Sequence, residues 1–146
     1  MKFKLTIDPE KEEEISIISN SANDFIAKIE DLVLGYNGSA SLFAHDDDEI
    51  INLEFKEIAC ITIDDRRTYA VDVRGRKYRI NETLVGVEGK VPSYFIRINK
   101  SAIANEREIK CFKTAFSGAV DVVFKCGYSD YVSRRCFAEI KRRYNI

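Results

Sequence analysis

The sequence has little of the chemistry on which enzymes and metal sites depend. It contains one histidine, His45, and four cysteines without C-x-x-C spacing: Cys60, Cys111, Cys126 and Cys136. Zinc sites need clustered Cys and His ligands, and one histidine beside an acidic turn does not make a nucleophile–base pair. Glycine-rich phosphate-binding patterns are also missing. We therefore expect no enzymatic activity, no metal and no cofactor, and we expect reduced, largely buried cysteines.

Long apolar runs are missing as well. No apolar stretch approaches the roughly 18 residues that mark a membrane-spanning helix. The first residues, MKFKLTIDPEKEEE, lack the apolar stretch and the small-residue cleavage site of a signal peptide. These absences predict a protein without a membrane segment and with a cytoplasmic location.

Charge, by contrast, is abundant and unevenly distributed. The net charge of the 146 residues is −1, yet residues 1–57 carry 5 Lys/Arg and 14 Asp/Glu, whereas residues 58–146 carry 18 and 10. Such asymmetry indicates a polyanion-binding part joined to an acidic part. A chance split of ordinary surface charge is the alternative, and the positions of the cations decide between the two.

Hydrophobic periodicity predicts a mainly β chain with short helices, α+β overall. Polar and apolar residues alternate, as in half-buried strands, in a series of short segments. These segments are 2–7, 14–19, 41–44, 51–55, 61–63, 69–73, 78–80, 95–98, 109–115 and 120–124. Apolar residues at helical spacing predict helices over 22–34 and 133–144, with one or two helical turns over 82–88. The charge shift near the acidic turn at 46–49 divides the chain into a βα segment, residues 1–44, and a strand-rich domain, residues 45–146.

The most informative segment is FIRINKSAIAN at residues 95–105. Here a predicted buried strand ends in three adjacent polar residues, Asn99, Lys100 and Ser101. A cationic, hydrogen-bonding strand tip of this kind places donors toward an anionic surface.

Two further arginine pairs belong to the same pattern. Arg134 and Arg135 follow the predicted helix N-cap Ser133, and cations in a first turn oppose the helix macrodipole at a cost of about 0.3–1 kcal/mol each. An external phosphate or base would account for them. Arg66 and Arg67 lie in a polar loop between two predicted strands. If one face gathers all these cations, it is a binding surface for phosphates and base edges.

Other cations need no such function. The basic run at 74–79 places Lys77 and Arg79 on one face of a strand, opposite Tyr78 and Ile80, as on a solvated outer sheet face. Auxiliary phosphate contacts are the weaker interpretation of this run. The cations at 141–143 are favoured by the dipole at a helix C-terminus.

Residues 50–146 combine several elements in a recognisable order: a strand–polar loop–strand over 61–73, the segment 95–105, and a glycine-turned strand pair that leads into the last helix. Within the segment, a strand with an Arg is followed by a polar loop ending in Ser and a hydrophobic step to an Asn. The residues that fit are Phe95, Arg97, Ser101, Ile103 and Asn105. This combination resembles the LytTR family of bacterial DNA-binding domains. The resemblance implies an elongated arrangement of small antiparallel β-sheets with short helices and no helix-turn-helix.

The resemblance also implies that loops contact double-stranded DNA in successive major grooves, with two copies often bound on repeated sites. Carried over by position, the base-reading candidates are Arg66 or Arg67, Lys100 and Arg135. The neighbouring phosphate contacts would be Asn99, Ser101 and Arg134. Asn105 is expected to be structural instead, because a buried Asn can tie loop backbone groups together.

Two functions from different classes follow from these patterns. The first is a sequence-specific transcriptional regulator that binds DNA as a homodimer. Many such domains follow a receiver domain, but residues 1–44 are too short for that fold, so we expect a stand-alone member whose acidic N-terminal segment serves dimerisation or contacts another protein. The second is a protein-interaction or ligand-sensing module without DNA binding, for which the acidic first part is the support.

Overall fold

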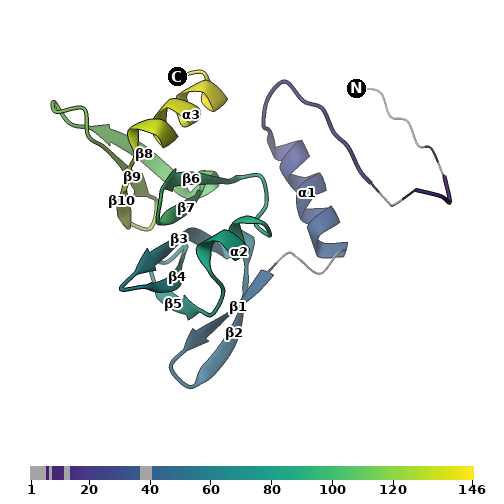
Figure 1. Cartoon of the computed structure of the whole chain (residues 1–146), viewed down its shortest axis with the longest axis horizontal. Coiled ribbons are helices and arrows are strands. Elements are labelled where there is room, and N and C mark those ends of the chain that lie inside the picture. The colour runs from purple at the N-terminus through teal and green to yellow at the C-terminus, as the bar shows by residue number, and fades with distance from the viewer. Residues whose placement is uncertain (1–5, 7, 12–13, 37–40) are drawn as a thin grey trace.

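The computed structural model describes residues 6, 8–11, 14–36 and 41–146, which form two antiparallel sheets and short helices (Figure 1). In chain order the elements are α1 (Asp24–Tyr36), β1 (Ser41–Asp46), β2 (Glu49–Glu54), the 3-10 turn η1 (Phe55–Glu57), β3 (Ile58–Asp64), β4 (Arg67–Asp72), β5 (Lys77–Ile80), α2 (Leu84–Glu88), β6 (Phe95–Asn99), β7 (Ala102–Asn105), η2 (Glu106–Glu108), β8 (Ile109–Thr114), β9 (Val120–Phe124), β10 (Ser129–Val132) and α3 (Arg134–Tyr144). The larger sheet has the order β2-β1-β5-β4-β3-β7-β6, and the smaller has the order β10-β9-β8. The predicted fold class, mainly β and α+β overall, is confirmed.

The central strand β3 is buried on both of its faces. Its first five residues are all buried, although a half-exposed strand would alternate. Ile58 and Ile61 face one hydrophobic core, whereas Ala59 and Cys60 face the other. Strands that are covered on both faces read as continuous apolar runs, which is how this one reads. β3 therefore separates the two cores.

The second core joins the two sheets. The larger sheet turns small side chains toward it, among them Ala102 and Ala104, whereas β9 contributes the fully buried Val122 and Phe124. Small residues on one side let the sheets approach closely, and larger residues on the other fill the space between them. α3 covers this core with Ile140, so its position depends on how well the two sheets pack.

The N-terminus of α3 has the predicted cap. The backbone N–H of Cys136 donates to Ser133 Oγ at 3.2 Å, which satisfies one of the unpaired donors of the first turn. The helix prediction over 133–144 is confirmed, and Arg134 and Arg135 occupy its first turn.

The N-terminal part differs from the prediction. Residues 14–19 form no strand, and Ile18 is 99% exposed. Alternating sequence alone does not make a strand when neither a neighbouring strand nor a core covers its apolar side. The strand predicted over 2–7 falls mostly outside the described residues. β1 begins at Ser41 and pairs with β2 along its whole length, so the strand pairing of the larger sheet reaches back to that residue.

α1 forms where helical periodicity predicts it, but its apolar stripe is covered only in part, since Ile26, Ile29 and Val33 are half-buried. The Tyr94 hydroxyl donates to Asp31 Oδ1 at 3.2 Å, and Arg107 forms an ion pair with Asp31 at 3.7 Å. Burial, together with the Asp31 carboxylate, raises the pKa of Tyr94. Phe25 and Leu32 of the apolar stripe are exposed. The acidic side of α1 therefore contacts the strand-rich part, and two residues of the apolar stripe remain exposed.

The cysteines follow the prediction only in part. All four are free thiols, but only Cys60 is buried, and its burial raises the pKa of its thiol. The other three are half-buried. No helix of the described residues is long and apolar enough to cross a bilayer.

Candidate nucleic-acid interface

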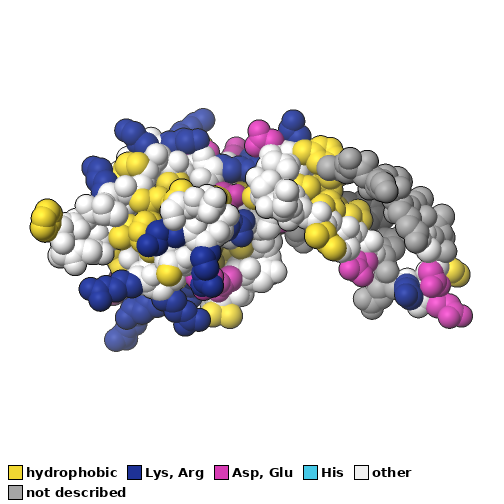
Figure 2. Space-filling view, turned by 90° about the horizontal axis from the view of Figure 1, so that it is seen from above, with side chains coloured by type: hydrophobic (Ala, Val, Ile, Leu, Met, Phe, Trp, Pro, Cys, Tyr) yellow, Lys and Arg dark blue, Asp and Glu magenta, His cyan; other side chains and the backbone are white. Residues whose placement is uncertain are grey.

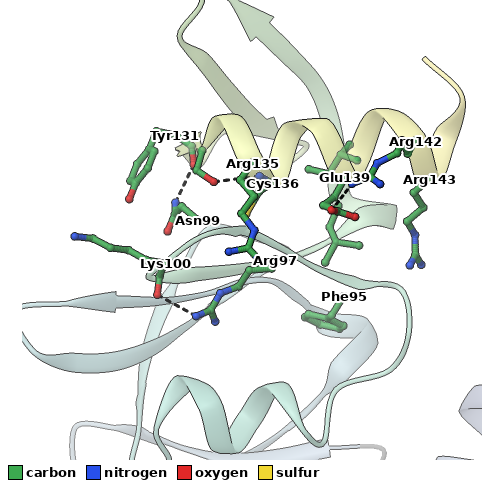
Figure 3. A pocket seen from close by; sticks show the side chains of 13 residues that line it. Phe95, Arg97, Asn99, Lys100, Tyr131, Arg135, Cys136, Glu139, Arg142 and Arg143 are labelled. Carbon is green, nitrogen blue, oxygen red and sulfur yellow. Dashed lines mark hydrogen bonds and ion pairs between the residues drawn. The ribbon is translucent and has the colours of Figure 1, made fainter.

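An open groove of ≈ 1040 Å³ lies between α3 and the β6–β7 hairpin (Figure 3). We call it the cationic groove, because five basic residues line it: Arg97, Lys100, Arg135, Arg142 and Arg143. Figure 3 shows Lys100 and Arg97 on the hairpin side, with Arg135 reaching down from α3. The structure thus brings together two residues, Lys100 and Arg135, that the sequence predicts as base readers.

The β6–β7 turn consists of Lys100 and Ser101, between the paired residues Asn99 and Ala102. Arg97 supports this turn, since its guanidinium donates to the Lys100 carbonyl oxygen at 3.1 Å. The same guanidinium forms an ion pair with Glu88 at 3.3 Å. The side chain of Lys100 itself is exposed. Its ammonium group is therefore presented to solvent on a backbone that Arg97 holds in place.

The neighbouring Asn99 lies inside the protein and is only 1% exposed. Its amide donates to the Tyr131 carbonyl oxygen at 2.8 Å, and its Oδ1 accepts the Ser101 N–H at 2.7 Å. A side chain so buried and so fully hydrogen-bonded is not available to a phosphate. The structure therefore does not favour the phosphate contact that the sequence predicts for Asn99.

The β3–β4 turn, Asp65 and Arg66, lies beside this hairpin. Both residues have positive φ, 45° and 63°, in a two-residue loop between the paired Asp64 and Arg67. Such loops favour Asn, Asp and Gly, so Asp65 suits its position, whereas the side chain of Arg66 is strained in the left-handed region. Strain of this kind gathers at functional sites. An arginine held there is better explained by an external contact than by the stability of the turn.

Arg134 and Arg135 both project from α3 as exposed side chains. Arg135 lines the cationic groove, whereas Arg134 is not among the residues that line it. Within the described residues, none of the predicted DNA-contacting cations forms an ion pair; these are Arg66, Arg67, Lys100, Arg134 and Arg135. Their charges are therefore not neutralised by the described carboxylates.

The basic run at 74–79 behaves differently, as the sequence suggests. Arg76 forms an ion pair with Asp46 at 2.6 Å, and Lys77 forms one with Asp64 at 3.1 Å. Tyr78 on the opposite face is buried. The interpretation of this run as a solvated outer sheet face is supported by these pairs.

Cations gather on one part of the molecule. Figure 2 shows Lys and Arg side chains spread over the large body of the protein, whereas the helix beside it shows mainly apolar and acidic side chains. Figure 1 places the β3–β4 turn, the β6–β7 hairpin and the start of α3 on the side away from α1. The charge asymmetry of the sequence is therefore also an asymmetry in space.

A smaller hollow of ≈ 370 Å³ adjoins the β6–β7 turn and has a different character. Asp64, Asp130 and Tyr128 line it together with Lys77. Burial raises the pKa of Asp130, and burial also raises the pKa of Tyr128 to about 12. A phosphate gains little beside these carboxylates. The electrostatics therefore favour a nucleic-acid backbone in the cationic groove over this hollow.

Arg97 and Tyr131 line the groove but were not among the sequence-based candidates for DNA contact. Arg97 entered the family resemblance only as the arginine of the strand. The sequence feature that could have identified it is its polar side chain between two buried neighbours, Ile96 and Ile98. Tyr131 is half exposed at the groove. The sequence feature that could have identified Tyr131 is its position directly before the buried Val132, where neighbouring strand residues face opposite sides.

The comparisons with known proteins agree with this geometry. Residues 48–145 match the sequence profile of the LytTr DNA-binding domain, which is more than half of the chain. The chain belongs to the LytTR family. The predicted membership is thereby confirmed, and with it the DNA-binding character of this region.

Relatives of the same length support the family assignment. An uncharacterized HTH-type transcriptional regulator of Staphylococcus aureus (strain bovine RF122 / ET3-1) is 29% identical over 100% of this chain and 99% of its own. The regulator of the same description from strain MSSA476 is 28% identical over the same shares. A LytTr DNA-binding domain from Bacillus cereus has the same fold, with a TM-score of 0.67 and 18% identity over 73% of this chain and 98% of that one. Although the relatives are described as HTH-type, strands separate all the helices that the structure describes in this LytTR protein.

Proposed function

We propose that this LytTR protein reads a specific DNA site with three elements: the β3–β4 turn, the β6–β7 turn and the first turn of α3. Its function at the coarser level, that of a DNA-binding transcriptional regulator, follows from the family and the named relatives. The comparisons lend no support to the alternative of an interaction or sensing module without DNA binding. In our proposal Lys100, Arg135 and one of Arg66 and Arg67 reach base edges, while Arg134 contacts a phosphate. Ser101 lines the smaller hollow beside Asp64 and Asp130, so the electrostatics do not favour the phosphate contact that the sequence predicts for it.

One observation carries the proposal. The three elements, together with Arg67 at the start of β4, hold five cations that form no ion pair with described carboxylates, and the elements are joined to one another by backbone contacts. Ile63, next to the β3–β4 turn, donates its N–H to the Ser101 carbonyl oxygen at 2.8 Å. Ser133, the cap of α3, donates its N–H to the Ile98 carbonyl oxygen at 2.9 Å. Separate loops would not hold their cations at fixed spacing, as successive grooves require.

We further propose that the protein acts in the cytoplasm, where its DNA is, and binds as a homodimer on repeated sites. The exposed part of the apolar stripe of α1, which includes Phe25 and Leu32, supports a contact outside the domain. A second copy or another protein would serve as the partner of this N-terminal part.

Fluorescence anisotropy tests the proposal. The purified protein is titrated against DNA from its own upstream region and against a scrambled duplex, across a series of salt concentrations. The proposal leaves two of the five cations for phosphates in each copy, so log K should fall against log[salt] with a slope of roughly −2 for one bound copy and roughly −4 for a homodimer. Tighter, saturable binding to the native fragment would support autoregulation.

Other outcomes separate the parts of the proposal. Equal, salt-sensitive binding to both duplexes keeps DNA binding and sends the search for the site to random-sequence selection. The absence of binding to any duplex, selected pools included, at low salt would overturn the proposal.

The strained turn offers a test that separates function from stability. Arg66→Gly is expected to stabilise the protein by up to about 1 kcal/mol, because glycine adopts positive φ without a clash. The same change should weaken specific binding about tenfold if Arg66 is the base reader. Urea unfolding and anisotropy give the two values. Asp65→Gly changes the same turn without removing a cation. Because Asp already tolerates positive φ, it should change stability little and leave binding intact; a loss of affinity in both variants would point to the turn shape instead.

A further inference from the structure

The buried Asn99 joins segments that belong to different sheets. It lies at the end of β6 in the larger sheet, whereas Tyr131 lies in β10 of the smaller sheet. The Asn99 amide donates to the Tyr131 carbonyl oxygen at 2.8 Å, and at a longer 3.4 Å to Asp130 Oδ1. β10 leads directly into the cap of α3. This amide group therefore anchors the strand that leads into α3, the helix that carries Arg135.

The other end of the same amide anchors the β6–β7 turn. Asn99 Oδ1 accepts the Ser101 N–H at 2.7 Å, which fixes the turn that carries Lys100. Figure 3 shows Asn99 between Lys100 and Tyr131, with Arg135 across the groove. One planar amide thus joins the β6–β7 turn to β10, the strand that leads into α3 on the other side of the cationic groove.

Burial makes this link rigid. With 1% of its surface exposed, Asn99 cannot exchange its protein partners for water. A buried hydrogen bond that is lost leaves its partner unsatisfied, here the Tyr131 carbonyl, and that costs more than the bond contributes when made. The relative position of the two segments is therefore determined by this side chain together with the Ser133–Ile98 backbone bond.

We propose that Asn99 is a positioning residue that couples the two base-reading elements, so that Lys100 and Arg135 recognise their base pairs as one unit. The inference rests on the proposed function of these two residues. In this proposal Asn99 does not contact a phosphate itself. It acts on DNA recognition by fixing the backbone of the β6–β7 turn and of β10. The contribution of Lys100 to affinity and base discrimination should then depend on Arg135, and the reverse, only while the Asn99 amide is present.

A double-mutant cycle measures this coupling. Specific binding is determined for the wild type, Lys100→Ala, Arg135→Ala and the double variant, each with Asn99 and each with Asn99→Ser. Serine keeps a hydroxyl oxygen that can accept the Ser101 N–H, but it lacks the amide NH₂ group that donates to the Tyr131 carbonyl oxygen. We expect the effects of the two single changes to deviate from multiplicativity by about threefold or more with Asn99, and by less than about twofold with Asn99→Ser. A coupling that is absent with Asn99, or unchanged with Asn99→Ser, would overturn the inference.

The chain offers a matched control in Asn105. It is equally buried, its amide donates to the Ile58 carbonyl oxygen at 2.9 Å, and its Oδ1 accepts the Arg107 N–H at 3.0 Å. Asn105→Ser should destabilise the protein to a similar extent in urea unfolding, yet leave the coupling between Lys100 and Arg135 unchanged. Loss of coupling in both variants would mean a general loss of rigidity and would contradict a specific role of Asn99.

The outcomes also distinguish the inference from the proposed function. If Lys100→Ala and Arg135→Ala leave binding unchanged, the assignment of the base readers fails and the inference fails with it. If both weaken binding but their coupling does not depend on Asn99, the base readers stand and only the inference fails. If the serine hydroxyl in Asn99→Ser still bonds the Tyr131 carbonyl oxygen, the coupling is measured again with Asn99→Ala. That variant is compared at a temperature where it remains folded.

Discussion

Lys100→Ala and Arg135→Ala are each expected to weaken specific DNA binding by about 1–3 kcal/mol, the range for a lost base-edge contact. Both residues line the cationic groove, and both are free of ion pairs within the described part of the chain. Truncation therefore removes a contact to DNA without breaking a described salt bridge. Anisotropy against the selected site and against single-base variants of it would also show relaxed preference at one position for each variant.

Lys90→Ala serves as the control for a change of net charge. Lys90 is a surface cation that forms an ion pair with Glu82 at 2.6 Å, and surface pairs of this kind contribute little to stability. Its loss should leave the site preference unchanged. Unchanged affinity and unchanged preference in both Lys100→Ala and Arg135→Ala would contradict the assignment of the groove as the reading surface.

Phe124→Ala is expected to have the largest effect on stability, a loss of about 3–5 kcal/mol in the free energy of unfolding. Phe124 is fully buried in the core between the two sheets, beneath α3. Deleting its ring leaves a cavity in the contact that positions the arginines of α3. Urea denaturation gives the loss of stability, and we expect DNA affinity to fall with temperature earlier than in the wild type.

The β8–β9 hairpin, to which Phe124 belongs, also provides the matched control. Phe116 lies beyond the end of β8 and is fully exposed. Phe116→Ala should change the free energy of unfolding by no more than about 0.5 kcal/mol, as is usual for surface positions. A comparable destabilisation by both substitutions would show that the second core is not organised around Phe124.

Much of the fold was predictable because local patterns agree with the tertiary structure. The strands β6, β8 and β9 and the helix α3 appear where the sequence places them, whereas the sequence did not predict β7 and β10. The cap Ser133 also acts as predicted, since capping is a local interaction between residues three positions apart. The strand predicted over 14–19 is wrong for the opposite reason. A strand needs a partner across the ladder, and no local pattern specifies one.

The candidate site shows the same division. The sequence identified the cationic segments, since charge, turn composition and order along the chain are readable without coordinates. It did not show that Asn99 is buried while its neighbour Lys100 is exposed, because adjacent polar residues look alike until the path of the backbone is known. Nor did it show that Arg97 holds the backbone of the β6–β7 turn.

By itself, the sequence determined the class of fold, the family and the residue types available for binding DNA. Periodicity, capping and charge order are local or compositional, and these properties follow from them. Only the tertiary structure decided which cations share a groove, which polar side chains are used inside the protein, and which face of α1 is covered. Those outcomes depend on contacts such as Asn99 with Tyr131 and Tyr94 with Asp31, between residues about 30 or 60 positions apart. Close packing of two sheets and a helix brings such residues together, and no window of the sequence contains that information.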